Sequence, residues 1–276
     1  MTHSNDSWAK MADTWQFIPP PLRPQPDDVV AVAAHLKQYF PSGARGLILG
    51  VTPEYCHLAT KLKHDVYALD ISNTMINRIW PGPKNCATQG NWMQMPFGAQ
   101  NFDWLILDGG FALLPHPVGQ AAVIKEVFRI LKPGGLFFIR LFTPPILAER
   151  QANPIDNIET LLRDGTIANV SQLKLWLWGT LQIDATCGIG LMDIARTLAQ
   201  VVPKLDELLR ELGWPQRDID GLNAYNTNPA RYYLTDEKQT LELLQNDPGG
   251  FNLLTAHRGQ YAFAECCALL VLLRNG

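Results

Sequence analysis

Cysteine is scarce in this chain and stands in no pattern that would bind a metal or build a disulfide framework. The five cysteines are odd in number, and none is part of a C-x-x-C motif, so we expect reduced core thiols in a cytoplasmic protein and no metal site. The longest apolar stretch, Cys266 to Leu273, is far too short to cross a bilayer and is expected as a buried strand. The polar N-terminus does not resemble a signal peptide. We therefore expect no association with a membrane.

Concentrated positive charge is also missing. The net charge is −3 and no block is rich in lysine or arginine, which argues against a nucleic-acid partner. Apolar residues make up 47% and charged residues 18%, which is typical of a folded globular chain and excludes a mostly disordered one. There is no internal repeat and no low-complexity tract apart from a proline cluster at Pro19–Pro24. A small molecule is the expected partner, and a homodimer is left open.

The most informative feature that is present is Gly50 followed twenty residues later by Asp70. The apolar run Leu47–Leu49 ends at the glycine, a helix start follows, and a second apolar run, Val66–Leu69, ends at the acid. This pattern predicts a β-α-β unit whose two strand ends point the same way. The glycine turn is open to a ligand, and the carboxylate is able to accept hydrogen bonds from two ribose hydroxyls. The unit therefore predicts a nucleoside site.

The residues after Gly50 restrict which nucleoside would fit. Thr52 is expected as the helix N-cap, Pro53 as the first helical residue and Glu54 as an acid in the first turn. A dinucleotide needs free N–H groups here for its pyrophosphate, whereas this proline removes one and the glutamate would repel phosphate. A ligand without phosphate and with a cationic end, such as S-adenosylmethionine (SAM), suits the turn better. NAD, FAD and an ordinary turn without ligand are the alternatives.

Strands and helices alternate through the first half of the chain. Strands are expected near 47–49, 66–69, 86–89, 102–107 and 136–142, and helices near 27–39, after Thr52, and over 72–79 and 118–131. Five such alternations predict a parallel, doubly wound α/β sheet. A helix at 236–246 and two closing strands at 251–258 and 262–274 are expected near the C-terminus.

The two remaining stretches are expected to lie over this sheet. Residues 1–26 contain four large apolar side chains followed by prolines, and we expect an extended arm that forms a lid. Residues 146–229 show helical patterns at 155–163, 170–181 and 192–212 and no strands, so we expect a helical cap. The expected domain is therefore built from 27–145 and 230–276, with the cap inserted. In the cap, Trp176 and Trp178 are expected either as core or, for one of them, as a wall of the acceptor pocket.

Several short segments occur in the order found in one enzyme family. The spacings between these segments also match those of that family. The segments are Asp70-Ile71-Ser72 with Met75-Ile76, Gly90-Asn91-Trp92-Met93-Gln94-Met95-Pro96-Phe97, Phe102-Asp103 and Leu131-Lys132-Pro133-Gly134-Gly135. Over roughly residues 27–145 and 232–276 the chain resembles the class I SAM-dependent methyltransferases. The resemblance implies a mostly parallel seven-stranded sheet with an antiparallel C-terminal hairpin strand. It also implies SAM as methyl donor and S-adenosylhomocysteine as product.

The chain departs from that family in its first glycine motif. Only Gly50 remains of three glycines, and Ile48 stands in place of the acid. Asn91 replaces an aspartate that usually accepts from the adenine amino group, and an amide oxygen is still able to accept that bond. The expected function is methyl transfer to a small molecule. A protein that binds SAM or a nucleoside without catalysis is the alternative.

The expected cofactor contacts come from the strand ends and the arm: Trp15, Arg23, Gly50, Val51, Thr52, Glu54, Asp70, Ile71, Met75, Asn91, Trp92, Asp108 and Gly109. Several of them have a simpler alternative. Asp70 either binds the ribose or caps the next helix, Gly50 either meets the ligand or only allows a turn, and Trp92 either stacks on the adenine or is core.

Asp108 and His116, which both follow the fourth expected strand, are candidates for catalysis. Asp108 either holds the SAM ammonium, takes a proton from the acceptor, or bonds the amides of the Gly109-Gly110 turn. His116 lies in a proline-flanked loop near the same edge and is either a general base or a surface residue. Arg23 and Arg140 are both candidates to pair with the carboxylate of SAM.

Overall fold

The computed structural model describes residues 5–145, 155, 157–246 and 250–276. Its main sheet has seven strands in the order β3-β2-β1-β4-β5-β9-β8. The strands are β1 (Arg45–Leu49), β2 (Asp65–Asp70), β3 (Ala87–Gln89), β4 (Phe102–Asp108), β5 (Leu131–Arg140), β8 (Phe251–His257) and β9 (Leu269–Arg274). β1 to β5 pair in parallel, and β9 is antiparallel to both β5 and β8. The expected doubly wound sheet with an antiparallel C-terminal hairpin is confirmed.

Side chains alternate between two apolar layers on the faces of this sheet. Leu47 and Leu49 of β1 join the core under α5 (Val118–Ile130) and α11 (Glu237–Asn246). Ile48, between them, joins the core under α2 (Pro26–Tyr39), α3 (Pro53–Lys61) and α4 (Asn73–Ile79). This alternation follows from the two-residue period of a strand. Because β1 to β5 run in parallel, their carboxyl ends form one edge.

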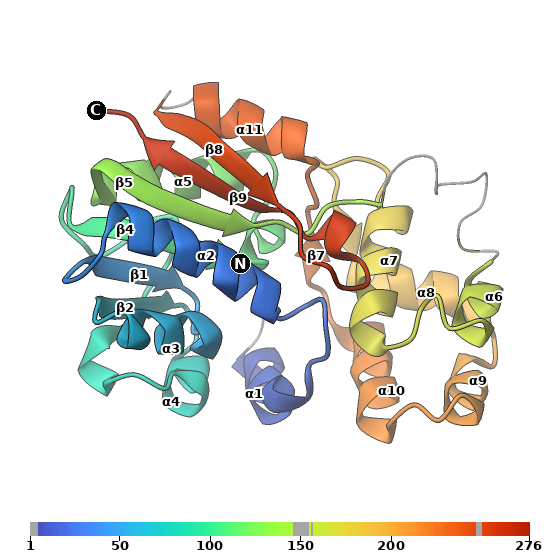
Figure 1. The fold of residues 1–276 in the computed structure, drawn as a ribbon. Helices are drawn as coiled ribbons and strands as arrows, with labels where there is room; N and C mark the ends of the chain where they lie inside the picture. Colours follow the sequence, from blue (N-terminus) through green and yellow to red (C-terminus); the bar gives the residue numbers. More distant parts are fainter. Residues whose placement is uncertain (1–4, 146–154, 156, 247–249) are drawn as a thin grey trace.

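The cap is a separate helical layer beyond that edge, on the right in Figure 1. It contains α6 (Ile158–Arg163), α7 (Val170–Leu181), α8 (Leu191–Val201), α9 (Leu205–Glu211) and α10 (Gln216–Asn223). Their buried core also includes Ala112, Phe142, Cys266 and Cys267 from the edge of the sheet domain. Two expectations for the cap were wrong. The pattern over 192–212 forms two helices, because Val202 precedes Pro203 and leaves the helical region (φ −129°, ψ 73°). A short antiparallel pair, β6 (Ile189–Gly190) and β7 (Arg231–Tyr232), also occurs.

The N-terminal arm differs from the expected extended lid in its first part. Residues Asn5–Thr14 form helix α1, and Trp15–Phe17 form one 3₁₀ turn. Trp8, Met11 and Trp15 pack against the α2–α4 side of the core, and their spacing is that of one helix face. The proline-rich part that follows is not extended throughout as expected: it makes a turn at Pro20-Pro21 and a bend at Leu22-Arg23 before α2 begins.

The closing strand is shorter than expected. β9 begins at Leu269 and not near Ala262, because Ala264–Cys266 forms a 3₁₀ turn that follows Phe263 in the left-handed region (φ 66°). The expected turn at Lys132–Gly135 lies inside β5, where the register against β4 shifts between Phe102 and Trp104. Gly134 has φ 75° there, which only glycine adopts readily.

Candidate functional site

Gly50 lies at the carboxyl end of β1 and has φ 105°. A residue with a side chain rarely adopts this conformation, so the glycine is required by the turn itself. Its N–H donates to the Leu69 carbonyl at 2.8 Å, which holds the ends of β1 and β2 together. The two strand ends that the sequence pairs are therefore adjacent in the fold.

Asp70 ends β2 and is buried, with 6% of its surface exposed. One carboxylate oxygen, Oδ1, accepts the Ser72 N–H at 2.7 Å. No donor among the described residues reaches Oδ2. Desolvation raises the pKa of Asp70 to about 6, and the Ser72 bond opposes this shift. Asp70 therefore supports the next turn with one oxygen and keeps the other available to a ligand.

Glu54 lies in the first turn of α3, and Thr52 is the N-cap residue without a side-chain capping bond. Arg23 donates to Oε1 of Glu54, through Nε at 2.9 Å and through Nη2. The carboxylate that we expected to be open is therefore paired within the chain. The two side chains are 21% and 22% exposed. Oε2 is buried and has no partner among the described residues. The helix start therefore presents one unsatisfied acceptor.

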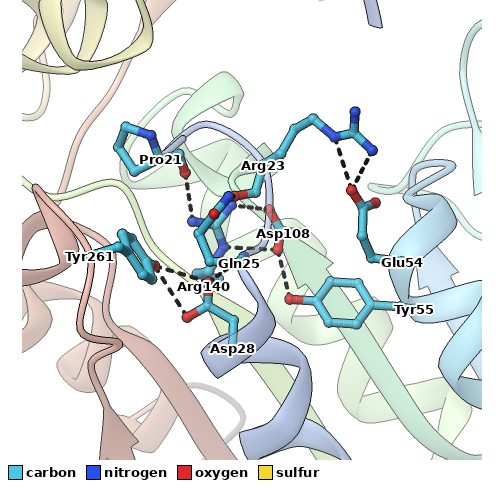
Figure 2. Close-up of polar contacts among 9 residues, drawn as sticks. All are labelled: Pro21, Arg23, Gln25, Asp28, Glu54, Tyr55, Asp108, Arg140 and Tyr261. Carbon is cyan, nitrogen blue, oxygen red and sulfur yellow. Dashed lines mark hydrogen bonds and ion pairs between the residues drawn. The ribbon is translucent and has the colours of Figure 1, made fainter. Parts of the chain in front are cut away.

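Trp15 and Arg23 from the arm lie together over this helix start. Arg23 Nη1 donates to the Trp15 carbonyl at 3.2 Å, and the guanidinium lies 5.5 Å from the centroid of the indole. Trp15 Nε1 is buried and, among the described residues, donates to no acceptor. An unsatisfied donor and an unsatisfied acceptor thus belong to the two residues that Arg23 contacts. Figure 2 shows Arg23 reaching from the arm to Glu54.

Asp108 ends β4 opposite Arg140, the last residue of β5. Arg140 Nε donates to Oδ2 at 2.9 Å and Nη2 to Oδ1 at 2.6 Å, and the Tyr55 hydroxyl donates to Oδ2 at 2.8 Å (Figure 2). The Asp108 and Arg140 side chains are 5% and 0% exposed. Both oxygens of Asp108 are therefore occupied, and the expected role as base or ammonium ligand is not supported. Arg140 is equally unavailable to a carboxylate of SAM.

The same ion pair holds the arm through Arg140, and the neighbouring Asp28 binds the loop of the C-terminal hairpin. Arg140 Nη1 donates to the Pro21 carbonyl at 2.8 Å. Asp28, in the first turn of α2, accepts from the Tyr261 hydroxyl at 2.9 and 3.1 Å and from the Gln25 N–H at 2.9 Å. Desolvation raises the pKa of Asp28, and the Arg140 charge opposes that rise. This network was not predicted from the sequence, because Tyr55 and Tyr261 belong to no recognisable motif.

Trp92 lies across the ends of β1, β2 and β4, and Asn91 precedes it in the same turn. Asn91 Oδ1 accepts the Met93 N–H at 3.0 Å and so closes its own turn. Trp92 Nε1 donates to the Leu69 carbonyl at 2.7 Å. A Cβ placed on Gly50 would lie 3.8 Å from the Trp92 ring, and one on Gly110 would lie 2.7 Å from it. The Trp92 indole therefore lies beside the Gly50 turn that we expected to be open to a ligand.

The other expected contacts are divided between core and surface. Val51 and Met75 are each 2% exposed and belong to the α2–α4 side of the core, so their side chains are not available to a ligand. Ile71 is 37% exposed beside Asp70. Gly109 has φ 63°, donates its N–H to the Arg140 carbonyl at 2.9 Å, and packs against Phe142.

His116 follows the same edge, in the loop between β4 and α5. It is half-buried, and its Nδ1 lies 2.8 Å from Oε1 of Gln120. In the cap, Trp178 donates to the Tyr225 hydroxyl at 3.1 Å and stacks on Tyr232, with centroids 4.2 Å apart. Trp176 and Trp178 are both buried in the cap core.

Within the part of the chain that the structure describes, no group of three or more histidine, cysteine, aspartate or glutamate residues is placed to hold a metal ion. The helices described there include none with the length and hydropathy needed to span a membrane.

Comparison with known proteins shows that part of this chain is similar to a family of methyltransferases. The family model described as a methyltransferase domain matches residues 49–139, which run from the end of β1 to the middle of β5. A demethylmenaquinone methyltransferase from Lysinibacillus sphaericus is 32% identical over 76 residues. That match covers 26% of this chain and 31% of the relative, so the chain spans about a third of the curated relative's length.

Solved structures resemble the fold over nearly the whole chain. An N-methyltransferase from Bradyrhizobium japonicum, in complex with S-adenosylhomocysteine, is 14% identical, with 99% of both chains covered and a TM-score of 0.52. A SAM-dependent methyltransferase from Methanosarcina mazei is also 14% identical, with 92% of this chain and 99% of the other covered and a TM-score of 0.52. A Rhodobacter sphaeroides protein described provisionally as a Zn-dependent alcohol dehydrogenase is 14% identical, with 100% of both chains covered and a TM-score of 0.64.

At these identities the structural likeness concerns the fold alone. The sheet order and the antiparallel strand agree with it, and the family match covers the strand ends where Gly50, Asp70 and Asp108 lie. Residues 49–139 of this chain therefore match the methyltransferase-domain family model, and the chain as a whole has the fold of the class I SAM-dependent methyltransferases.

Proposed function

We propose that this protein transfers a methyl group from SAM to a small-molecule acceptor. The observation that carries the proposal is Asp70, a buried acid with one unoccupied oxygen, placed beside the glycine turn at Gly50. The family match spans both residues. Structural neighbours with this fold include the N-methyltransferase bound to S-adenosylhomocysteine and a 1,6-didemethyltoxoflavin-N1-methyltransferase from Burkholderia thailandensis.

The unsatisfied polar atoms of the site fit the two ends of SAM. At the nucleoside end, Asp70 Oδ2 is an acceptor for a ribose hydroxyl, and the half-exposed Ile71 adjoins it. At the amino-acid end, Glu54 Oε2 is an acceptor for an ammonium and Trp15 Nε1 is a donor to a carboxylate. Arg23 contacts both of these residues. Buried polar atoms without a partner are costly, so a ligand that satisfies both would be favoured.

The residues of this chain would act mainly by positioning. When bound, SAM supplies an electrophilic methyl group whose sulfonium is a good leaving group, so little covalent chemistry is left to the protein. The Asp108–Arg140 pair fixes the ends of β4 and β5 and anchors the arm at Pro21. The arm and the cap would exclude water and hold the acceptor in line with the methyl group. His116 is the candidate to take a proton where the acceptor carries one.

A small acceptor is favoured by charge and by the covering elements. The net charge of −3 does not suit a polyanionic substrate. The aromatic core of the cap lies next to the strand edge, with Phe142 touching Gly109 and facing Trp178 at 6.2 Å between centroids. Such surroundings favour a partly apolar acceptor.

Titration calorimetry with SAM and with S-adenosylhomocysteine tests the first step. Both should bind, and Asp70→Ala should weaken binding by roughly tenfold to a hundredfold, because ribose hydroxyls left unpaired cost about 1–3 kcal/mol. Asp65→Ala, at the exposed opposite end of β2, is the matched control and should bind normally. Equal affinities in the two variants would remove Asp70 from the site.

Transfer of a labelled methyl group to a panel of small O–H, N–H and carbon nucleophiles tests the second step. Turnover with at least one acceptor is expected. Tight binding of both cofactor forms without turnover on any acceptor would favour the alternative, a protein that binds SAM without catalysis.

A further inference from the structure

Gln120, in the first turn of α5, is completely buried and has a fixed amide orientation. Its Nε2 donates to the Phe111 carbonyl at 3.3 Å and to the Tyr233 carbonyl at 3.1 Å. Carbonyl oxygens only accept, so both amide hydrogens are directed at these two groups. The Gln120 oxygen must therefore face the other way, towards His116.

This orientation determines where His116 carries its proton. Gln120 Oε1 lies 2.8 Å from His116 Nδ1. Because an amide oxygen has no hydrogen to give, Nδ1 is the donor, and in the neutral ring the lone pair is on Nε2. The His116 ring is half-buried, in the loop that leaves the carboxyl end of β4, on the same edge as Gly50 and Asp70.

We propose that Gln120 is a positioning residue that holds His116 as its Nδ1–H tautomer, so that Nε2 accepts the proton of the methyl acceptor. This rests on the proposed function. The acceptor atom forms a bond to the methyl carbon while the carbon–sulfur bond breaks, and its electron pair remains on sulfur as a neutral thioether. The acceptor's proton moves to Nε2 and later leaves to water. A base oriented by a third group is a common arrangement in catalysis.

The return of the chain from the cap completes this arrangement. Tyr233 directly follows β7, and its N–H donates to the Ala112 carbonyl at 2.7 Å. Its carbonyl then receives Gln120 Nε2. One of the two hydrogen bonds that fix the Gln120 amide therefore comes from the segment after the cap, which links the state of His116 to the docking of that segment on the turn after β4.

Nitrogen-15 NMR of the full chain with labelled histidine tests the tautomer directly. His64 is an internal reference of the opposite kind, because its Nδ1 accepts from Trp104 Nε1 at 3.1 Å and its Nε2 donates to the Phe40 carbonyl at 3.0 Å. We expect His116, assigned from its loss in His116→Asn, to show Nδ1–H while His64 shows Nε2–H. An Nε2–H signal from His116 would overturn the proposal.

Two variants at Gln120 separate positioning from packing. Gln120→Met removes the acceptor, and His116 should become a mixture of tautomers while the His64 signal, which reports the folded core, stays unchanged. Gln120→Glu keeps an acceptor and should restore Nδ1–H. An unchanged His116 signal in Gln120→Met would contradict the role of Gln120.

Kinetics then connect the tautomer to methyl transfer. Gln120→Met and His116→Asn should each lower kcat by about a hundredfold, the range of general base catalysis, with S-adenosylhomocysteine affinity unchanged by calorimetry. A combined variant should be no worse than His116→Asn alone. Losses that multiply, or a parallel loss of affinity, would overturn the positioning role. If the wild-type chain binds neither cofactor form, the proposed function fails while the tautomer result stands.

Discussion

Asp70 is a residue whose ionised form is poorly accommodated by the unliganded fold. Burial raises its pKa to about 6, whereas in an unfolded chain an aspartate titrates near pH 3.9. The folded protein therefore binds this proton more tightly than the unfolded chain does. The free energy of unfolding should fall as the pH rises from about 4 to about 6 and should not change further above that range on account of this group.

Replacing Asp70 by asparagine tests this destabilisation. Asp70→Asn keeps an acceptor for the Ser72 N–H and removes the buried charge, so the unliganded protein should gain roughly 1–3 kcal/mol at pH 8. Urea denaturation at pH 8, 6 and 5 measures the gain, which should shrink as the pH falls. A loss of stability at pH 8 would show that the ionised carboxylate stabilises the empty site.

Gly46 shows how closely a strand can approach a buried aromatic side chain. A Cβ at this position would lie 2.0 Å from the Trp104 ring, and Trp104 is held by its bond to His64. We expect Gly46→Ala to destabilise the fold by about 1–3 kcal/mol or more through overpacking. Gly98→Ala, where no atom lies within 4 Å of the new Cβ, is the control and should be nearly neutral in the same denaturation measurement.

At the scale of elements, the buried Asp108–Arg140 pair joins β4, β5, α3 and the arm. Arg140→Met should cost about 3–5 kcal/mol, because it leaves Asp108 buried without a cation. Asp108→Leu combined with Arg140→Met should cost less than Arg140→Met alone. The exposed pair of Arg163 with Glu159 gives the comparison, since Arg163→Met should change the unfolding free energy by less than about 1 kcal/mol.

Sequence reasoning succeeded for elements whose signals are local. Helices α2, α4 and α5 were expected within one residue of their observed bounds, and α4 is capped locally by Ser72, which accepts the Met75 N–H at 3.3 Å. Helix α1 was missed because the prolines that follow it were given more weight than the helical spacing of Trp8, Met11 and Trp15. The break at Pro203 was missed because the apolar period continues on both sides.

The candidate site was predictable only where it follows from strand ends. Gly50 and Asp70 meet because parallel strands end at one edge, and the sequence shows both ends. The pairing of Asp108 with Arg140, 32 residues later, depends on the register of β4 against β5. The bond from Arg23 to Glu54 depends on the path of the arm. Tertiary placement therefore decided which charged residues face a ligand and which neutralise each other.

At the scale of the whole molecule, a ligand that binds only the folded state must stabilise it. With S-adenosylhomocysteine at a hundred times its dissociation constant, the unfolding free energy should rise by about 2.7 kcal/mol, which raises the melting temperature by roughly 5–10 °C for a chain of this size. Thermal scans with and without the compound measure this. At the same concentration, adenosine should give a smaller rise, because it lacks the amino-acid end and should bind less tightly. Equal shifts would mean that Glu54 and Trp15 take no part.

The position of β9 between β5 and β8 has a consequence for biosynthesis. β5 finds its antiparallel neighbour only after the cap and α11 have been made, since Leu136 pairs with Leu273. Until β9 has been synthesised, the edge of β5 that it covers has no strand beside it and is open to wrong partners. Arrested chains that end before Leu269 should therefore remain dependent on chaperones.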